Sequence, residues 1–441
     1  MEILKNAERM LKKYALCDDC LGRQFALLGY GMENKMRGYS IKLVLAMQAH
    51  EKALNDNKRA ISLLKKLVLN GNFQIAKVLL EKLGVKTDVE KPFKCYLCEN
   101  KFEEIENLAK KAIEKMKGWE YETFLVGITL PKEIMEREDE FKSEFEVTYG
   151  ESLKNHFSRE IGKKIAELTG KEADLKNPHI VVLVNPFTER VKVQVNPLFI
   201  SGRYRKLVRN IPQSKWICTK CQGKGCERCN WTGKMYPESV AEIISTPVLE
   251  MTEGKTTAFH AAGREDVDAR MLGLGRPFVI EVKKPKKRFI DLKELESRIN
   301  DFGSGKVEVL NLNFALREDV ERIKKGEGTQ KVYRVLVELE NEVSDEELEK
   351  LERILTGCKI SQQTPIRVLH RRANLTREKY IYETKVKRLT PKMVEMQIRC
   401  QGGLYIKELI TGDMGRTKPN VSELLKTRAT PISLDVLDVV M

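Results

Sequence analysis

The sequence has 441 residues, of which 41% are hydrophobic, and it carries a formal net charge of +15. This length excludes a single small binding module and predicts about two to four domains of roughly 100–200 residues each. The hydrophobic share excludes a chain that is disordered throughout, and the excess of positive charge indicates a polyanionic partner.

No apolar run approaches the roughly 18 residues that a membrane span requires. Glu2 and Glu8 also interrupt the start of the chain, where a secretory signal needs a continuous apolar run. We therefore expect a cytoplasmic protein that does not contact membranes. No obligate protein partner is evident from the sequence.

Along the N-terminal 200 residues, we expect a helical part first and then a part with both helices and strands. Apolar residues recur at helical spacing over 1–83. Further helices are expected near 102–117, 131–146 and 151–169, and strands at 121–130, 179–185 and 190–200. Alternation of this size predicts a small α/β layer domain over about 100–200.

The C-terminal residues, from about 237 to 441, mix strands and helices. Strands are predicted in PFVIEVKK, KVYRVLVELE and KMVEMQIRC, and helices in DLKELESRIN and SDEELEKLERIL. We expect a mixed β-sheet with flanking helices here, and a mixed α/β (α+β) fold overall. The predicted parts are 1–200, a basic linker at 201–236, and 237–441.

Eight of the ten cysteines form four Cys-x-x-Cys pairs, a spacing that places two thiolates on the same side of a tetrahedral ion. The third and fourth pairs are close in sequence and predict a zinc knuckle within 201–236. The first two pairs are far apart, and whether they share an ion is left open. We expect one or two structural zinc ions held by Cys17, Cys20, Cys95, Cys98, Cys218, Cys221, Cys226 and Cys229.

Disulfides and redox chemistry are the alternatives for these pairs. The absence of an export signal disfavours disulfides, and no strand and helix flank Cys95 in the way that a thioredoxin-like motif requires. Cys358 and Cys400 belong to no pair, and buried packing is the expected role for both.

The positive charge is concentrated in residues 201–235, where nine basic residues and one acidic residue give +8 of the total +15. Tyr204, Trp216 and Trp231 are interleaved with these cations, as a surface that binds phosphates and stacks on bases requires. A merely solvated face is the alternative. Nucleic acid is therefore the leading candidate partner.

Several catalytic classes lack their motifs. There is no G-x-x-x-x-G-K-[ST] phosphate loop, and GLGRPF at 273–278 neither follows a clear strand nor opens a helix, as a dinucleotide-binding turn must. The H-x-E motif of zinc deaminases is absent as well. The remaining candidate is the acidic, glycine-containing segment at 263–268, which indicates a carboxylate nucleophile or base, or else an Asx turn with surface ion pairs.

The segment GRED at 263–266, followed by V-D-A-R-x-L-G-x-G-R-P-F, resembles the active-site loop of the archaeal and eukaryotic tRNA pseudouridine synthases that carry an N-terminal THUMP-type domain. Residues 195–216 are similar to that family's junction between accessory and catalytic domains, and 364–372 to its basic segment. Residues 400–420 resemble the G-T-Y-I-R motif of the wider superfamily. The resemblance implies a THUMP-like domain over about 100–200 and a catalytic domain over 237–441.

The resemblance also implies roles for individual residues. Asp266 would be the catalytic carboxylate, whether it attacks the base or the ribose or stabilises positive charge on the sugar. Lys407 would pair with Asp266; many synthases have Arg at this position, so a point charge replaces a bidentate group. The uracil pocket would be lined by Tyr333, Tyr405, Ile406, Lys407 and Leu434. An ordinary strand aromatic and a core leucine remain the alternatives for Tyr333 and Leu434.

The implied substrate is the TΨC arm and elbow of tRNA, with uridine 55 and also uridine 54 as targets. The reaction is an isomerisation that needs no organic cofactor. The RNA would be held by Arg203, Arg205, Lys206, Arg209, Arg371 and Arg372. Another THUMP-bearing tRNA-modifying enzyme and a non-catalytic tRNA-binding chaperone are the alternatives.

Overall fold

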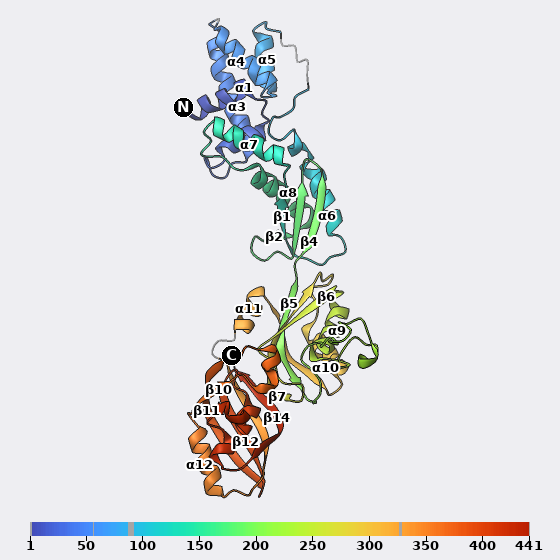
Figure 1. Ribbon diagram of the computed structural model, residues 1–441. Coiled ribbons are helices and arrows are strands. Elements are labelled where there is room, and N and C mark those ends of the chain that lie inside the picture. The colour runs from blue at the N-terminus through green and yellow to red at the C-terminus, as the bar shows by residue number, and fades with distance from the viewer. Residues whose placement is uncertain (1, 56, 87–91, 326–328, 441) are drawn as a thin grey trace. The chain divides into compact units, whose positions relative to one another are not determined.

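The computed structural model describes residues 2–440 except 56, 87–91 and 326–328. The chain divides into two compact units, Met1–Asn196 and Pro197–Met441. Figure 1 shows the first unit in blue to green and the second in yellow-green to red. Over the described residues, no helix has both the length and the apolar character needed to cross a membrane.

The first unit begins with a helical bundle, as the periodicity of its sequence predicts. Its helices are α1 (Glu2–Lys13), α2 (Asp18–Gly22), α3 (Asn34–Ala53), α4 (Lys58–Leu69) and α5 (Gln74–Lys82). Leu11, Leu45 and Leu64, on three different helices, are almost fully buried in a shared core.

A four-stranded sheet completes the first unit, in the order β2-β1-β3-β4. Its strands are β1 (Thr123–Ile128), β2 (Glu172–Ala173), β3 (Ile180–Asn185) and β4 (Arg190–Val195). Helix α6 (Ile105–Met116) precedes β1 in the sequence, and α7 (Lys132–Glu144) and α8 (Leu153–Thr169) lie between β1 and β2. Strand β1 runs parallel to β2 and β3, whereas β4 is antiparallel to β3. Helices α6 and α8 pack on each other and on the sheet. The predicted α/β layer domain is therefore present.

The second unit is built on a mixed ten-stranded sheet, in the order β13-β10-β11-β12-β9-β14-β7-β5-β8, with β6 paired to β7. The strands are β5 (Leu198–Lys206), β6 (Thr256–Ala261), β7 (Arg270–Lys283), β8 (Val307–Ala315), β9 (Gln330–Leu339), β10 (Lys359–Gln363), β11 (Thr376–Thr390), β12 (Met393–Gln401), β13 (Thr417–Lys418) and β14 (Ala429–Val440). The β14–β7 pair is parallel, and the pairs of β9 with β12 and β14 are antiparallel. The expected mixed sheet is confirmed.

Six helices accompany this sheet within the described residues. They are α9 (Val240–Thr252), α10 (Leu292–Gly303), α11 (Arg317–Lys325), α12 (Asp345–Leu355), α13 (Ile406–Thr411) and α14 (Val421–Leu424). Helices α9 and α10 pack together against the β6, β7 and β8 region, and α12 packs on β11.

The start of the second unit differs from the expected linker at 201–236. Residues 201–206 are part of β5, which pairs with β7 on one side and β8 on the other. The predicted strand at 190–200 is accordingly two strands, since β4 ends at Val195 and Pro197, which lacks a backbone N–H donor, precedes β5. Alternate positions of β5, such as Ile200 and Tyr204, face the core. Basic residues stand at other positions of this strand, so the sequence does not show a plain alternation of apolar and polar residues.

Two glycines give a matched test of the packing in the first unit. A Cβ added at Gly38 of α3 would lie 1.9 Å from the Asp18 carbonyl oxygen of α2, whereas one added at Gly162 of α8 would lie 3.9 Å from the nearest atom, on Val126. We expect Gly38→Ala to destabilise the fold by about 3 kcal/mol or more, because backbone must move. Gly162→Ala should stabilise it by up to about 1 kcal/mol, since alanine favours helix.

Thermal unfolding of the full chain measures both changes. Equal melting temperatures for the two variants would contradict the close α2–α3 packing.

Candidate active site

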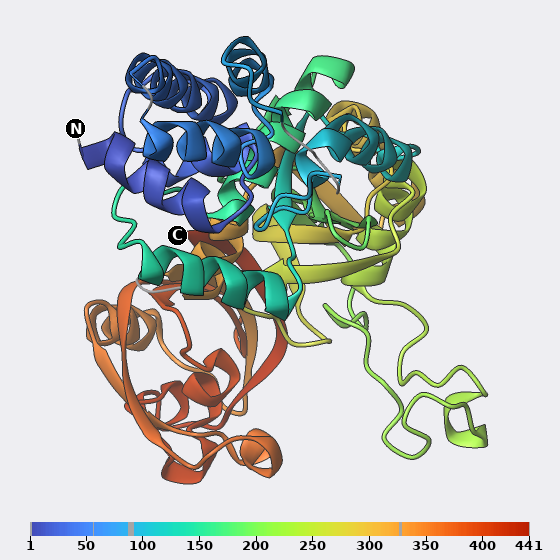
Figure 2. The same ribbon diagram turned by 90° about the horizontal axis from the view of Figure 1, so that it is seen from above.

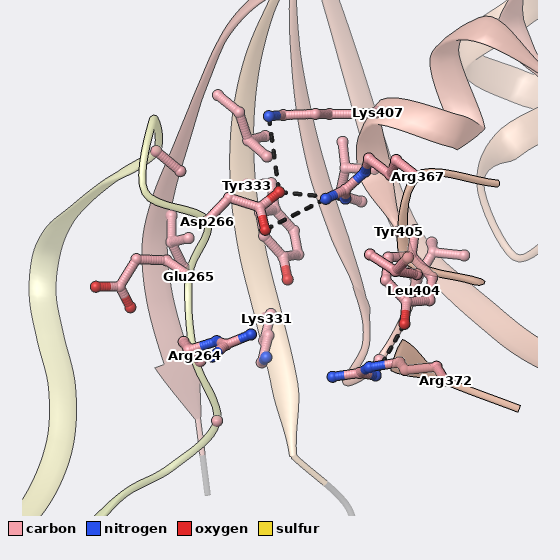
Figure 3. Close-up of a pocket in the computed structure, with 17 residues that line it drawn as sticks. Arg264, Glu265, Asp266, Lys331, Tyr333, Arg367, Arg372, Leu404, Tyr405 and Lys407 are labelled. Atoms are coloured by element: carbon pink, nitrogen blue, oxygen red, sulfur yellow. Dashed lines mark hydrogen bonds and ion pairs between the residues drawn. The ribbon is translucent and has the colours of Figure 1, made fainter. Parts of the chain in front are cut away.

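A cavity of about 250 Å³ lies in the second unit, between the loop that joins β6 to β7 and the ends of several other segments. Strands β9 and β14, the 3₁₀ turn η4 (Ile366–Arg371) and the start of α13 form its remaining walls. The structure brings together here all six residues for which the resemblance implies catalytic or substrate-binding roles: Asp266, Tyr333, Tyr405, Ile406, Lys407 and Leu434 (Figure 3).

Two cations face the Asp266 carboxylate (Figure 3). Arg367 Nη2 lies 3.2 Å from Asp266 Oδ2, and Lys407 Nζ lies 3.6 Å from the same oxygen. The expected Lys407–Asp266 pair is therefore present, but Lys407 lies closer to Asp268 Oδ2, at 2.7 Å. Burial alone would raise the pKa of Asp268, and the hydrogen bonds from Lys407 more than offset this and hold that pKa below its usual value.

Arg367 is the closest cation to Asp266, and our sequence-based assignment of site residues omitted it. Its Nε donates to Glu408 Oε1 at 2.7 Å, and its guanidinium lies 5.9 Å from the centre of the Tyr405 ring. Glu408 is buried, so it fixes the direction in which the guanidinium points. The only sequence signal for Arg367 is its place in the basic segment 364–372.

Tyr405 caps the N-terminus of α13 and is held on three sides. The side chain of Gln362 accepts from the Tyr405 backbone N–H at 2.8 Å and donates to its carbonyl oxygen at 3.0 Å. Arg372 donates to the Tyr405 hydroxyl at 2.9 Å. This arrangement fixes the start of α13, so that the buried Ile406 and the partly exposed Lys407 both face the cavity.

Tyr333 and Leu434 lie on the adjacent strands β9 and β14 and are largely buried. Burial raises the pKa of Tyr333 well above its usual value, so its hydroxyl is neutral at physiological pH and can donate a hydrogen bond. Both side chains line the cavity and give it one aromatic and one aliphatic wall.

A buried ion pair supports the loop that carries Asp266. Arg276 of β7 donates from Nε to Glu265 Oε2 at 2.9 Å and from Nη1 to the Ala262 carbonyl at 2.7 Å. The Tyr204 hydroxyl donates to both Glu265 oxygens, at 2.9 and 3.1 Å. Gln213 in turn donates to the Tyr204 hydroxyl and to the Gly263 carbonyl. Glu265 is thus tied to β5 and β7, and the carbonyl of Gly263 is held by Gln213, which follows β5.

Lys206 belongs to this support and not to an RNA-binding surface. Its side chain is fully buried, and Nζ donates to the carbonyl oxygens of Ile211, Asp266 and Val267 at 2.8–3.1 Å. A phosphate cannot reach it, so our assignment of Lys206 to RNA binding is wrong. Tyr204 is buried as well and cannot stack on a base, contrary to our expectation.

The other predicted RNA-binding arginines of this segment are partly exposed but also bond to the protein. Arg203 pairs with Asp438 at 3.1 Å, Arg205 donates to the Gly273 carbonyl at 2.6 Å, and Arg209 pairs with Asp435 at 2.7 Å. Arg372 lies at the cavity. The side chain of Arg371 lies outside the described part of the structure.

The eight paired cysteines gather into two groups of four. Each group has its four sulfur atoms within 4.8 Å of one another. Distances of 3.6 Å for Cys17–Cys98 and 3.9 Å for Cys218–Cys226 fit the roughly 3.8 Å that a tetrahedral ion with 2.3 Å metal–sulfur bonds requires. Each group could hold one metal ion, and the two distant N-terminal pairs converge on a single position.

Backbone geometry supports thiolates in both groups. The N–H of Cys17 donates to Cys95 Sγ at 3.4 Å, and that of Gly233 donates to Cys229 Sγ at 3.3 Å. The second group lies in the segment between β5 and α9, which extends away from the sheet at the lower right of Figure 2. Trp231, at 74% exposure, lies beside it.

Comparisons with known proteins find family models that match parts of both units. The family model for the archaeal Pus10 THUMP domain matches residues 108–185, and the model for Pus10, C-terminal, matches residues 199–440. These ranges cover most of the sheet of the first unit and nearly all of the second unit.

Curated relatives match the chain over nearly its full length. The tRNA pseudouridine synthase Pus10 of Methanocaldococcus jannaschii is 47% identical over 448 residues, which cover 100% of this chain and 94% of that protein. The same enzyme of Methanothrix thermoacetophila is 41% identical, with 99% and 94% covered, and that of Pyrococcus furiosus is 40% identical, with 99% and 98% covered. The chain therefore belongs to the Pus10 family of tRNA pseudouridine synthases.

Proposed function

We propose that this protein isomerises uridine to pseudouridine in the TΨC arm of tRNA, at uridine 55 and also at uridine 54, with Asp266 as the reacting carboxylate. One observation carries the assignment of Asp266. Two carboxylates line the cavity, and Glu265 is already saturated by Arg276 and Tyr204. Asp266 is the carboxylate of this pair that a nucleotide in the cavity would meet.

The reaction breaks the N-glycosidic bond of uridine and joins carbon 5 of the same base to the ribose. A carboxylate can attack the ribose or the base, or it can stabilise positive charge at carbon 1′ of the ribose. Arg367 and Lys407 compensate the charge of Asp266 before substrate arrives, and Glu408 and Asp268 hold these two cations in place. The carboxylate is thus oriented in advance, which is a main source of enzymatic rate enhancement.

The cavity requires that the uridine leave its stack in the folded RNA. Extruding a base costs a few kcal/mol, which contacts elsewhere on the RNA must offset. We assign the extruded uracil to the walls formed by Tyr333, Ile406 and Leu434, with Tyr405 and Arg372 at the entrance. From the proposed tRNA substrate we infer a cytoplasmic location for this activity.

The backbone of the tRNA would be held by groups outside the cavity. The THUMP domain is one candidate, as a module that binds by shape and phosphate contacts. The knuckle segment is another candidate. Its Trp231 is exposed, and so are the cations Lys220, Lys224 and Arg228, which lie shortly before Trp231 in the sequence. Arg203, Arg205 and Arg209 could contribute only through the part of each side chain that their protein contacts leave free.

Asp266→Asn should abolish catalysis while leaving the fold and the RNA-binding surface intact. We expect pseudouridine formation in single-turnover reactions to fall by at least about 1,000-fold, because the amide cannot act as a nucleophile or stabilise a cation. Site-resolved mapping of tRNA transcripts would measure the product at positions 54 and 55 separately.

The matched control is Asp301→Asn, at an exposed acid near the end of α10. It should retain wild-type activity, and both variants should bind tRNA with the wild-type Kd within about threefold. Pseudouridine formation by Asp266→Asn at the wild-type rate would remove this residue from the mechanism.

We also propose that each group of four cysteines holds one structural zinc ion. The protein purified without added metal should contain two zinc ions per chain by elemental analysis. Cys98→Ser and Cys221→Ser should each lose one ion and lower the melting temperature, since binding of structural zinc contributes to folding. Cys358→Ser should keep both ions. A wild-type protein without zinc would contradict the assignment. A Cys221→Ser variant that still binds two ions would contradict it as well.

A further inference from the structure

The candidate active site contains a further cation, Lys331, that the reaction as described above does not use. It lies on β9 two residues before Tyr333, so the two side chains project from the same face of the strand, and both line the cavity. Figure 3 shows Lys331 on the side of Tyr333 away from the Asp266 carboxylate. Asp266 already has Arg367 and Lys407 beside it and does not need Lys331 as its counterion.

The surroundings of Lys331 leave its ammonium without an anion. Within the described residues, its side chain forms no hydrogen bond or ion pair, although Glu265, which is held by Arg276, lies close enough to act on it electrostatically. Burial, and after it the charge of Arg276, lower the pKa of Lys331 to about 8, although Cys400 and Glu265 oppose this shift. Keeping a half-desolvated ammonium unpaired is energetically costly, and such a charge is expected where a ligand completes its partners.

The approach to the ammonium is kept open by Gly263. A Cβ at this position would lie 3.2 Å from Lys331 Nζ and 3.4 Å from Arg276 Nη1, and the backbone has a φ of +77°, which disfavours other residues. The first glycine of the GRED segment thus leaves space on the cavity side of Lys331. A flat, polar ligand could reach the ammonium there.

We propose that Lys331 is a further catalytic residue, whose ammonium binds a carbonyl oxygen of the extruded uracil and stabilises the negative charge that the base gains when its bond to the ribose breaks. This proposal rests on the proposed function. With the base held against Tyr333, the ribose would face Asp266 and a uracil carbonyl would face Lys331. The positive charge on the ribose would then face the Asp266 carboxylate, and the negative charge on the uracil would face the Lys331 ammonium.

The charges balance through the reaction. When the bond between ribose carbon 1′ and uracil N1 breaks, its electron pair stays on the base and is shared by N1 and the two carbonyl oxygens. The positive charge at carbon 1′ is met by the Asp266 carboxylate. After the base turns, carbon 5 bonds to carbon 1′ and loses its proton, while N1 gains one, so the overall change is an isomerisation. Lys331 donates a hydrogen bond throughout and keeps its proton.

The test compares Lys331→Met and Lys331→Arg with Lys392→Met, at an exposed lysine that precedes β12. In single-turnover reactions on a tRNA transcript, Lys331→Met should lower the rate of pseudouridine formation at least about 100-fold, as loss of one preorganised donor does elsewhere. Lys331→Arg should retain part of the activity, and Lys392→Met should retain all of it. The Kd for tRNA should stay within about threefold in all three variants.

The dependence on pH separates a catalytic role from a structural one. The ammonium is protonated below its pKa of about 8 and loses its charge as the pH rises through that value. The wild-type rate should therefore fall above about pH 8. This fall should be absent in Lys331→Met, which has no charge to lose, and shifted to higher pH in Lys331→Arg, since guanidinium stays protonated.

Two results would overturn the proposal: a Lys331→Met rate within threefold of wild type, or a Lys331→Arg variant that is folded and binds tRNA but shows the unshifted alkaline fall. The Lys331→Arg result stands even if Lys331→Met fails to fold. A wild-type protein that forms no pseudouridine would instead contradict the proposed function itself, so the two failures are distinguishable.

Discussion

The buried ion pair between Arg276 and Glu265 is the interaction on which the candidate active site depends. Neither side chain is accessible to solvent, and together they anchor the loop from Ala262 to Ala269 to strand β7. Removing one partner of such a pair leaves an uncompensated buried charge, at a cost of about 3–5 kcal/mol. Tyr204 and Lys206 extend the same support from β5. The position of the Asp266 carboxylate thus follows from buried side chains that bond to one another and to the backbone of this loop.

The arrangement of charge in the cavity follows from this support. Asp266 projects from the anchored loop toward Arg367 and Lys407, which η4 and α13 supply from the other side. Lys331 lies on β9 without an anionic partner in the described residues. The site therefore offers an anion for the sugar and a cation for the base, separated by the wall that Tyr333 provides. An isomerisation that transiently separates charge between ribose and uracil would use both.

Much of the fold could be predicted from local pattern. Strands such as β9 and β12 and helices such as α10 and α12 have the periodicity of their elements. The Cys-x-x-Cys spacing indicated the group at 218–229, but it left open whether the pairs Cys17/Cys20 and Cys95/Cys98 share an ion. Motif resemblance indicated Asp266, Tyr333 and Lys407. Burial of individual cations could not be predicted in this way, because the sequence around a lysine such as Lys206 does not show whether its side chain lies in solvent or supports a loop. Arg367 and Lys331 were missed for a related reason: contacts between distant strands and turns place them, and no local pattern records those contacts.

We infer that Glu265 acts on catalysis only by holding the loop that carries Asp266. The most direct measurement is the single-turnover rate of Glu265→Gln on a tRNA transcript, with the Kd for tRNA determined in parallel. Glu294→Gln, which breaks an exposed ion pair with Arg298, serves as the control and should change stability by less than about 1 kcal/mol. We expect Glu265→Gln to bind tRNA normally but to form pseudouridine at least about tenfold more slowly. A folded Glu265→Gln variant with the wild-type rate would contradict it.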